Sequence, residues 1–161
     1  MRDYIFRGKS RYGDKWVEGC LIHQGDYCCI LHTDVHPADE PYLDGDNGCI
    51  DGYTTPVIPE SVGQYTGMND KNDRKIFEGD IVRTQPCSDR PYSKKQKFKE
   101  HIGVVKYNVR HFKNSFYEQD YEAVWTVDIK DMGEYGCYDW SMFFKCEVIG
   151  TVFENADLLE G

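Results

Sequence analysis

The residues with the clearest chemical potential are one cysteine and two histidines spaced four apart, Cys28, His32 and His36. Zinc in structural sites usually has four thiolate or imidazole ligands, which makes this trio a candidate. A spacing of four suits a helix, but residues 27–32 read as a strand, in which Cys28 and His32 lie too far apart to bind one ion directly. No second ligand pair has zinc-like spacing, so we interpret the three as scattered structural or surface residues and expect no metal.

Two further motifs suggest chemistry but lack essential members. Asp44–Gly48 resembles the start of a calcium loop, yet position twelve counted from Asp44 is Thr55, where a glutamate is needed. Cys20 and His23 could pair as nucleophile and base in space, but the sequence contains no Gly-x-Ser-x-Gly, phosphate loop or His-Glu-x-x-His. We therefore expect a protein that is not an enzyme and that carries no cofactor.

Residues 90–99 form a basic patch in which Tyr92 and Phe98 are interleaved, and the next acid is Glu100. Such a composition can hold single-stranded nucleic acid through charge and stacking. The alternative is a solvated loop, which we prefer because runs of charge are usually just exposed. The candidate binding residues are Arg90, Tyr92, Lys94, Lys95, Lys97, Phe98 and Lys99.

The overall charge argues against nucleic acid as the main partner. The 19 Lys and Arg against 28 Asp and Glu leave a net charge of −9, whereas nucleic-acid binders normally present positive charge to phosphates. Acids concentrate in residues 33–52 and in residues 118–139. These segments could form a negative face that imitates DNA and binds basic proteins, although ordinary solubility charge explains them as well.

The elements that must position these residues are mainly strands. Ala and Leu total 8 residues, whereas Val, Ile, Thr, Tyr, Phe and Trp, which favour strands, total 52. We expect an N-terminal β-unit over residues 1–75, with an acidic loop at 33–52, and an SH3-like small barrel over residues 76–161, together forming one mostly β unit. Strands are expected at 4–7, 15–23, 27–32, 55–58, 81–83, 102–107, 112–117, 122–129 and 143–153, a helical turn at 59–61, a tight turn at 67–75 and a turn or short helix at 155–159.

The cysteines and the N-terminus indicate a compartment. Seven cysteines, an odd number without any Cys-x-x-Cys, favour reduced thiols in a cytosol. Residues 1–9 lack the apolar core of an export signal, and no apolar run approaches the roughly 20 residues of a membrane span. We expect a cytoplasmic protein without membrane contact.

Several runs of the sequence resemble one family. They are Ile5-Phe6-Arg7-Gly8-Lys9 with Trp16-Val17 and Gly19, residues 57–72 from Val57-Ile58-Pro59-Glu60 to Asn69-Asp70-Lys71-Asn72, Ile76-Phe77-Glu78-Gly79-Asp80-Ile81-Val82, Ile102-Gly103-Val104-Val105-Lys106-Tyr107, and residues 147–155 with Leu158-Leu159. Together they resemble the YopX family of phage and prophage proteins. One position departs from the family pattern, because Asp73 follows Asn72 where glycine is usual; Asp tolerates a left-handed backbone better than most residues.

The resemblance implies a β-rich, SH3-like barrel protein, encoded by a phage or prophage, that works in the bacterial cytoplasm. It implies no established activity and supplies no catalytic residue. Unpaired strand edges predict a homo-oligomer, because pairing with a second copy satisfies them. We therefore expect a non-catalytic, self-assembling binding module whose partners are itself and a host or phage protein; nucleic-acid binding through residues 90–99 is the alternative.

Overall fold

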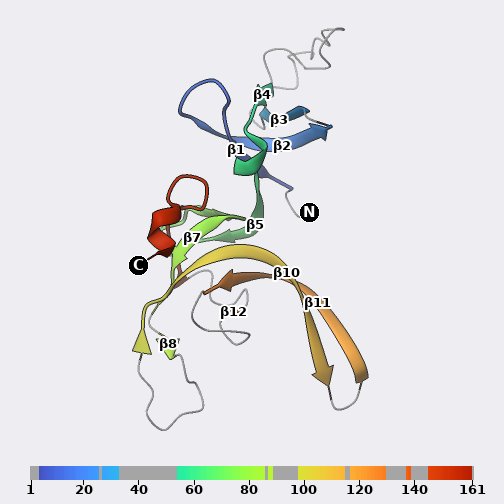
Figure 1. The fold of residues 1–161 in the computed structure, drawn as a ribbon, viewed down its shortest axis with the longest axis vertical. Helices are drawn as coiled ribbons and strands as arrows, with labels where there is room; N and C mark the ends of the chain where they lie inside the picture. The colour runs from blue at the N-terminus through green and yellow to red at the C-terminus, as the bar shows by residue number, and fades with distance from the viewer. Residues whose placement is uncertain are drawn as a thin grey trace. The chain divides into compact units, whose positions relative to one another are not determined.

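The computed structural model describes residues 4–25, 27–32, 54–85, 87–88, 98–114, 117–129, 137–138 and 145–160, with the backbone alone described for 87–88, 98, 110–114, 117–122 and 137–138. Most of these residues form antiparallel strands (Figure 1). Short 3-10 helices also occur, η1 (Pro59–Ser61) and η4 (Ala156–Leu159). The chain divides into two compact units, Met1–Tyr65 and Thr66–Gly161, and strand β5 (Gly63–Asn69) runs across the boundary.

The first unit is a single antiparallel sheet with the strand order β4-β3-β2-β1-β5. Its strands before β5 are β1 (Phe6–Lys9), β2 (Trp16–Gln24), β3 (Tyr27–His32) and β4 (Thr54–Pro56). The turn between β2 and β3 begins at Gly25, whose φ of +58° is one that glycine adopts without steric cost. Cys28, Ile30 and Val57 form the buried centre of the unit.

The second unit contains a five-stranded antiparallel sheet with the order β12-β11-β10-β7-β13. Its strands are β7 (Asp80–Arg83), β10 (Ile102–Asn114), β11 (Tyr117–Asp128), β12 (Cys137–Tyr138) and β13 (Glu147–Thr151). The end of β5 pairs with β6 (Lys75–Phe77), and β8 (Cys87–Ser88) pairs with β9 (Phe98–Lys99). The core consists of Ile76, Val82, Val105, Trp125, Val127, Ile129 and Cys146.

The core of the second unit follows from alternation along its strands. Val105 and Val127 are opposite each other in the β10–β11 register, and both are fully buried. Successive side chains of a strand point to opposite faces, so every second residue of β10 and β11 faces this core. The core therefore lies at the end of the hairpin nearest β7.

The predicted strands agree with the structure in the first unit and differ in the second. Residues 102–107 and 112–117 were expected as separate strands, but β10 runs without a break from Ile102 to Asn114. The expected turn at 67–75 is shorter, because β5 continues to Asn69 and β6 begins at Lys75. The helical turn at Pro59–Ser61 is confirmed as η1.

The expected mostly β class is confirmed. Among the described strands, the two outer strands of each sheet pair with a neighbour on one side only. The described sheets therefore do not close into a barrel. In the described part of the chain, no helix is long and apolar enough to cross a membrane.

Candidate functional site

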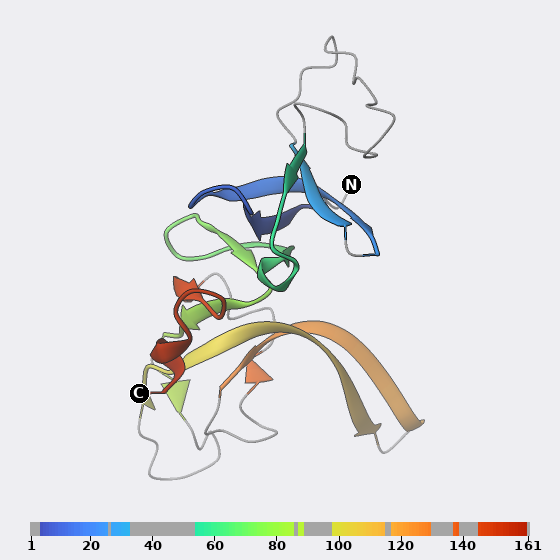
Figure 2. The same ribbon diagram turned by 45° about the horizontal axis from the view of Figure 1, so that its top comes forward.

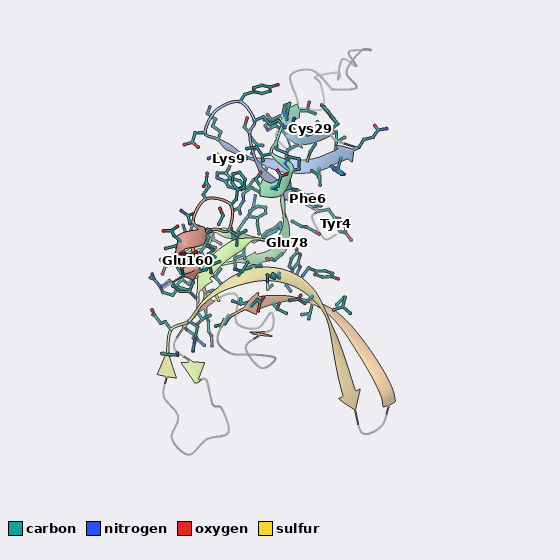
Figure 3. The ribbon with its side chains drawn as sticks, viewed as in Figure 1. Tyr4, Phe6, Lys9, Cys29, Glu78 and Glu160 are labelled. Carbon is teal, nitrogen blue, oxygen red and sulfur yellow. The ribbon has the colours of Figure 1, made fainter. Side chains whose placement is uncertain are left out.

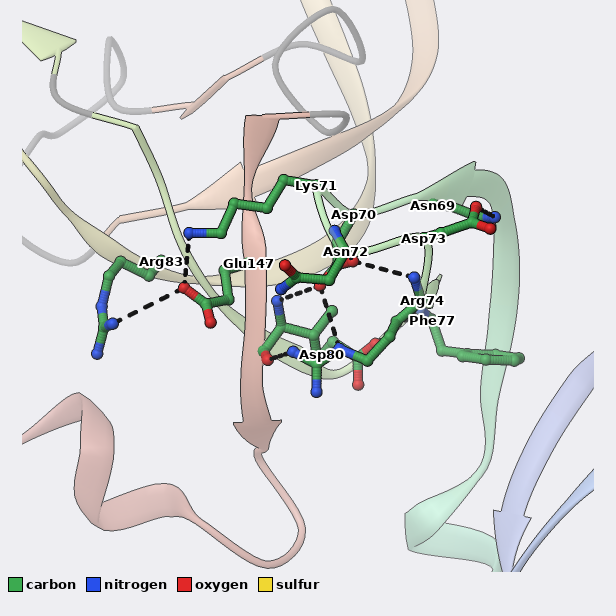
Figure 4. A network of polar contacts seen from close by, with 11 residues as sticks. Asn69, Asp70, Lys71, Asn72, Asp73, Arg74, Phe77, Asp80, Arg83 and Glu147 are labelled. Atoms are coloured by element: carbon green, nitrogen blue, oxygen red, sulfur yellow. Dashed lines mark hydrogen bonds and ion pairs between the residues drawn. The ribbon is translucent and has the colours of Figure 1, made fainter.

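The turn between β5 and β6 is built by backbone conformations that few residues adopt. Gly67, inside β5 and ahead of the turn, has a φ of +86°, and Asp73 within the turn has a φ of +64°. Asn69 Nδ2 donates to Asp73 Oδ1 at 2.7 Å, which holds the left-handed residue in place (Figure 4). Asp73 therefore occupies the conformation that the resemblance assigns to glycine, as its tolerance of this region predicts.

The carboxylate of Asp70 organises the same turn. Its Oδ1 accepts hydrogen bonds from the backbone amides of Asn72 (2.8 Å) and Arg74 (3.0 Å). Its Oδ2 accepts from the Val148 amide on β13 (3.0 Å) and from Arg74 Nε (3.3 Å). The Lys71 amide also donates to the Cys146 carbonyl at 2.9 Å, so the turn is fastened to the chain around β13 at several points.

The electrostatics of this network favour a structural role. Burial pulls the pKa of Asp70 upward, but hydrogen bonds from Val148, Arg74 and Asn72 together with the Arg74 charge hold it below its ordinary value. The side chain is 0% exposed and both oxygens already accept bonds. A carboxylate with these partners has no place for a substrate or a metal ion, so Asp70 acts as a clamp between the turn and β13.

Two ion pairs lie beside this clamp. Glu147 Oε2 is 2.8 Å from Lys71 Nζ and 3.9 Å from Arg83 Nη1 (Figure 4). The hydrogen bond and charge of Lys71 lower the pKa of Glu147. Both cations are about half exposed, so these pairs contribute little to stability.

A second junction of the unit is the turn between β6 and β7. Asp80 is fully buried, and its Oδ2 accepts a hydrogen bond from the Phe77 amide at 2.8 Å. Gly79, with a φ of +80°, donates from its amide to the Val105 carbonyl and accepts from the Val152 amide, both at 2.9 Å. The run Phe77-Glu78-Gly79-Asp80 therefore connects β10 with the end of β13 and performs no visible chemistry.

In the first unit, a basic side chain lies largely buried. Lys9, which is labelled in Figure 3, is 9% exposed. Its Nζ lies 5.7 Å from the centre of the Trp16 ring and pairs with Asp14. The hydrogen bond from Lys9 lowers the pKa of Asp14. Arg7 also lies over the same ring, at 4.7 Å. These cation–π and ionic contacts hold the first hairpin together.

Most of the predicted binding residues lie outside the described residues. This applies to Arg90, Tyr92, Lys94, Lys95 and Lys97. Phe98 and Lys99 form β9, where Phe98 pairs with Ser88 and Lys99 with Cys87 in the backbone register, and Lys99 is exposed. The two ends of the basic segment are therefore held side by side by the pairing of β8 with β9.

The weaker candidates do not form a site. Cys28 is buried, His32 Nε2 lies 2.8 Å from Thr55 Oγ1, and His36 lies outside the described residues. Cys20 and His23 are three positions apart in β2, so their side chains point to opposite faces of the sheet. Within the described residues, no three His, Cys, Asp or Glu side chains gather closely enough to hold a metal ion. The segment Asp44–Gly48 lies outside them.

The feature with the clearest capacity to bind is the β10–β11 hairpin, which extends well beyond the rest of its sheet (Figures 1 and 2). β7 pairs with β10 only at residues 102–104, and β12 pairs with β11 only at residues 127–128. Tyr107 and Val109 follow Val105 on the core face of β10 but are 51% and 58% exposed. The hairpin thus carries its apolar face past the core, and the sequence did not predict it because it indicated separate strands at residues 102–107 and 112–117.

These observations define a mostly β protein with two larger antiparallel sheets, a turn clamped by Asp70 and an extended hairpin. The family model described as YopX protein matches residues 6–160. This chain therefore belongs to the YopX family, as the resemblance indicated. A comparison with curated proteins found no match.

Proposed function

We propose that this protein is a non-catalytic, self-assembling module that binds copies of itself and, through the assembly, a host or phage protein. The observation that supports this proposal most is the β10–β11 hairpin, whose described backbone has strand partners on its outer edges only at residues 102–104 and 127–128. A strand edge with unpaired amides and carbonyls is a template for another strand.

The exposed side chains of the hairpin support the same function. Tyr107 and Val109 are large apolar groups on one face of β10, and more than half of each is exposed. Apolar groups gathered on a projecting element commonly mark an interaction surface. Covering them with a second copy would remove this area from water and satisfy the edge at the same time.

The test is the mass of the protein in solution. Size-exclusion chromatography with light scattering, between about 1 and 100 μM, a range typical for weak association, is expected to give a multiple of the mass of one chain. Val109→Glu is expected to lower that mass, because a charge replaces an exposed apolar group on the hairpin. The control is Tyr12→Glu, at an apolar residue of the first unit that is 79% exposed. A monomer at every concentration would overturn the proposal.

Nucleic-acid binding is the second candidate, and the pairing of β8 with β9 favours it. Because Ser88 pairs with Phe98, the basic segment between them begins and ends at one place in the second unit. Lys99, at its end, is exposed. Binding of a fluorescent oligonucleotide should then weaken steeply with salt and with loss of Lys94, Lys95 and Lys97. Binding that ignores both changes would speak against this candidate.

The proposal also includes a fold relationship and a setting. It takes the second unit as a variant of the SH3-like barrel, and it takes the protein as one that acts in the cytoplasm of a bacterial host of a phage or prophage. Membership of the YopX family supports this setting. An experimental structure of residues 76–161 within the full chain, with all of its loops, tests the barrel directly.

A further inference from the structure

The two strands of the extended hairpin carry opposite charges. β10 contains Lys106, Arg110 and Lys113 and no acid, whereas β11 contains four acids and no Lys or Arg. The acids of β11 are Glu118, Asp120, Glu122 and Asp128. The protein as a whole is acidic, with a net charge of −9, so a strand whose only charged residues are Lys and Arg differs from the rest of the chain.

Within one chain, this segregation stabilises the hairpin. Arg110 pairs with Glu122 in the backbone register, and Lys106 Nζ lies 2.6 Å from Asp128 Oδ2. Opposite charges on neighbouring strands attract, and like charges directly opposite repel. The same rule applies to a strand added on either outer edge of the hairpin.

Among the described residues, both outer edges of the hairpin lack a strand partner over much of their length. Beyond residue 105, whose carbonyl accepts from the Gly79 amide, the described backbone of β10 pairs with β11 alone. Over residues 117–126, the described backbone of β11 pairs with β10 alone. The open part of the basic edge therefore includes Arg110 and Lys113, and the open part of the acidic edge includes Glu118, Asp120 and Glu122.

We infer that copies of this chain assemble by placing the basic β10 edge of one copy beside the acidic β11 edge of the next, which extends one sheet across copies. The inference rests on the self-assembly proposed above and specifies its interface. Charge decides between the arrangements. Pairing β10 with β10 places like charges side by side, as does pairing β11 with β11, whereas β10 against β11 alternates the signs.

The inferred contact joins two different surfaces of the chain. A contact of this kind repeats from copy to copy and generates a ring if the rotation closes, or a filament if it does not. A twofold dimer through one edge would instead use the same surface twice. In this arrangement, Tyr107 and Val109 come to lie beside side chains of the neighbouring copy.

Photocrosslinking identifies which strands meet. The variant Val109→p-benzoylphenylalanine, labelled with ¹⁵N, is mixed with unlabelled wild-type protein and irradiated, and the crosslinked peptides are mapped by mass spectrometry. The labelling separates contacts between copies from the contact with Ala123 of the same chain. Unlabelled peptide from residues 117–128 is the expected partner. Unlabelled peptide from residues 102–114 would overturn the inference.

Charge exchange provides a second test. R110E/K113E makes both hairpin strands acidic, and E118K/E122K gives the open part of β11, residues 117–126, a net charge of +1 beside the basic β10, so each variant alone is expected to remain monomeric. An equimolar mixture is expected to assemble, because each strand then meets an opposite charge. Combining all four substitutions restores the net charge of −9 and the alternation, and should restore the wild-type mass. The neutral variant R110Q/K113Q, which retains polar side chains, should raise the concentration for half-assembly by roughly 2- to 10-fold.

The outcomes separate this inference from the proposed function. A wild-type monomer at every concentration rejects self-assembly itself. An oligomer whose mass is unchanged in both folded charge-reversal variants leaves self-assembly intact and rejects the β10–β11 contact. Far-UV circular dichroism identifies a variant that fails to fold, and for such a variant the crosslinked peptide decides.

Discussion

At Asp70, one carboxylate holds a turn to a strand that is more than seventy residues away in the sequence. Its four hydrogen-bond donors are three backbone amides and the Arg74 guanidinium. A buried acceptor with several charge-assisted bonds is costly to remove, because the donors lose their partners in a place that water does not reach.

We predict that Asp70→Asn destabilises the second unit by about 2–4 kcal/mol. The amide that replaces one carboxylate oxygen brings N–H groups toward donors and satisfies fewer of them. Chemical denaturation, monitored by tryptophan fluorescence, measures the loss. The matched control is Asp73→Asn, since Asp73 is exposed and asparagine also tolerates a φ of +64°. Equal denaturation midpoints for the two variants would show that Asp70 is not the clamp.

The lowered pKa of Asp70 also predicts how the free energy of unfolding depends on pH. The folded pKa of Asp70 lies below its ordinary value of 3.8, so the charged form stabilises the fold above that value. This contribution is lost as the pH falls from 3.8 through the lower folded pKa, because the unfolded chain binds the proton first. In Asp70→Asn, unfolding free energy measured from pH 6 to pH 2 should decline less steeply below pH 4 than in wild type. Parallel curves would contradict this prediction.

At the scale of elements, the central hairpin of the first unit depends on a close approach of two strands. Gly19 of β2 pairs with Phe6 of β1 and with His32 of β3. A Cβ atom added at Gly19 would lie 1.9 Å from the Leu31 carbonyl oxygen. No side-chain rotation relieves a contact between a Cβ and backbone, so the strands must separate.

We predict that Gly19→Ala lowers the stability of the first unit by more than about 2 kcal/mol. Cys20→Ala is the matched control, because Cys20 is the next residue of the same strand and is exposed. Hydrogen exchange measured by mass spectrometry reports the two units separately. Faster exchange in the peptides of β2 and β3 is expected for Gly19→Ala only. Wild-type protection of these peptides would contradict the prediction, because it would show that the sheet accommodates the methyl group without separation of the strands.

Several elements could be predicted from the sequence because their signals are local. Alternation in residues 15–23 predicted β2, the turn at Gly25-Asp26 predicted β3 as the next strand of a hairpin, and the proline at the start of Pro59–Ser61 indicated η1. The single long β10 was not predicted, because its outer half has polar and basic residues where a buried strand would have apolar ones. Those residues form a strand because β11 pairs with them, and this pairing is a long-range property.

The site shows the same limit. A tight turn was predicted over residues 67–75, and Gly67 and Asp73 within this range adopt positive φ values. The partner of Asp70 on β13 could not be predicted, because Val148 contributes its amide rather than a side chain. The charge segregation of β10 and β11 was visible in the sequence as a basic run followed by an acidic one, but only the register shows that the two runs lie side by side.

At the scale of the whole molecule, the net charge of −9 opposes assembly, because every copy repels every other at long range. Local complementarity along the hairpin must overcome this repulsion at contact. Acids away from the hairpin are therefore expected to weaken the assembly that the hairpin forms.

We predict that E60Q/E160Q, which changes the net charge from −9 to −7, preserves or strengthens assembly. Both residues are exposed and lie outside β10 and β11. The concentration for half-assembly should be unchanged or lower than that of wild type. It is measured at low salt, because salt screens the repulsion between copies. A variant that assembles less well would show that charge outside the hairpin forms part of the interface.

The buried cysteines of the two units allow local opening of each unit to be measured by the rate at which their thiols react. Cys28 and Cys29 are buried residues of β3 in the first unit and Cys146 is buried in the second unit, whereas Cys20 is exposed. Burial, together with the neighbouring Cys29, raises the pKa of Cys28, so its reactive thiolate is scarce until the sheet opens. The rate at which an alkylating reagent modifies each buried cysteine therefore reports the local opening of the unit that contains it. The exposed Cys20 gives the reaction rate of a thiol that needs no opening.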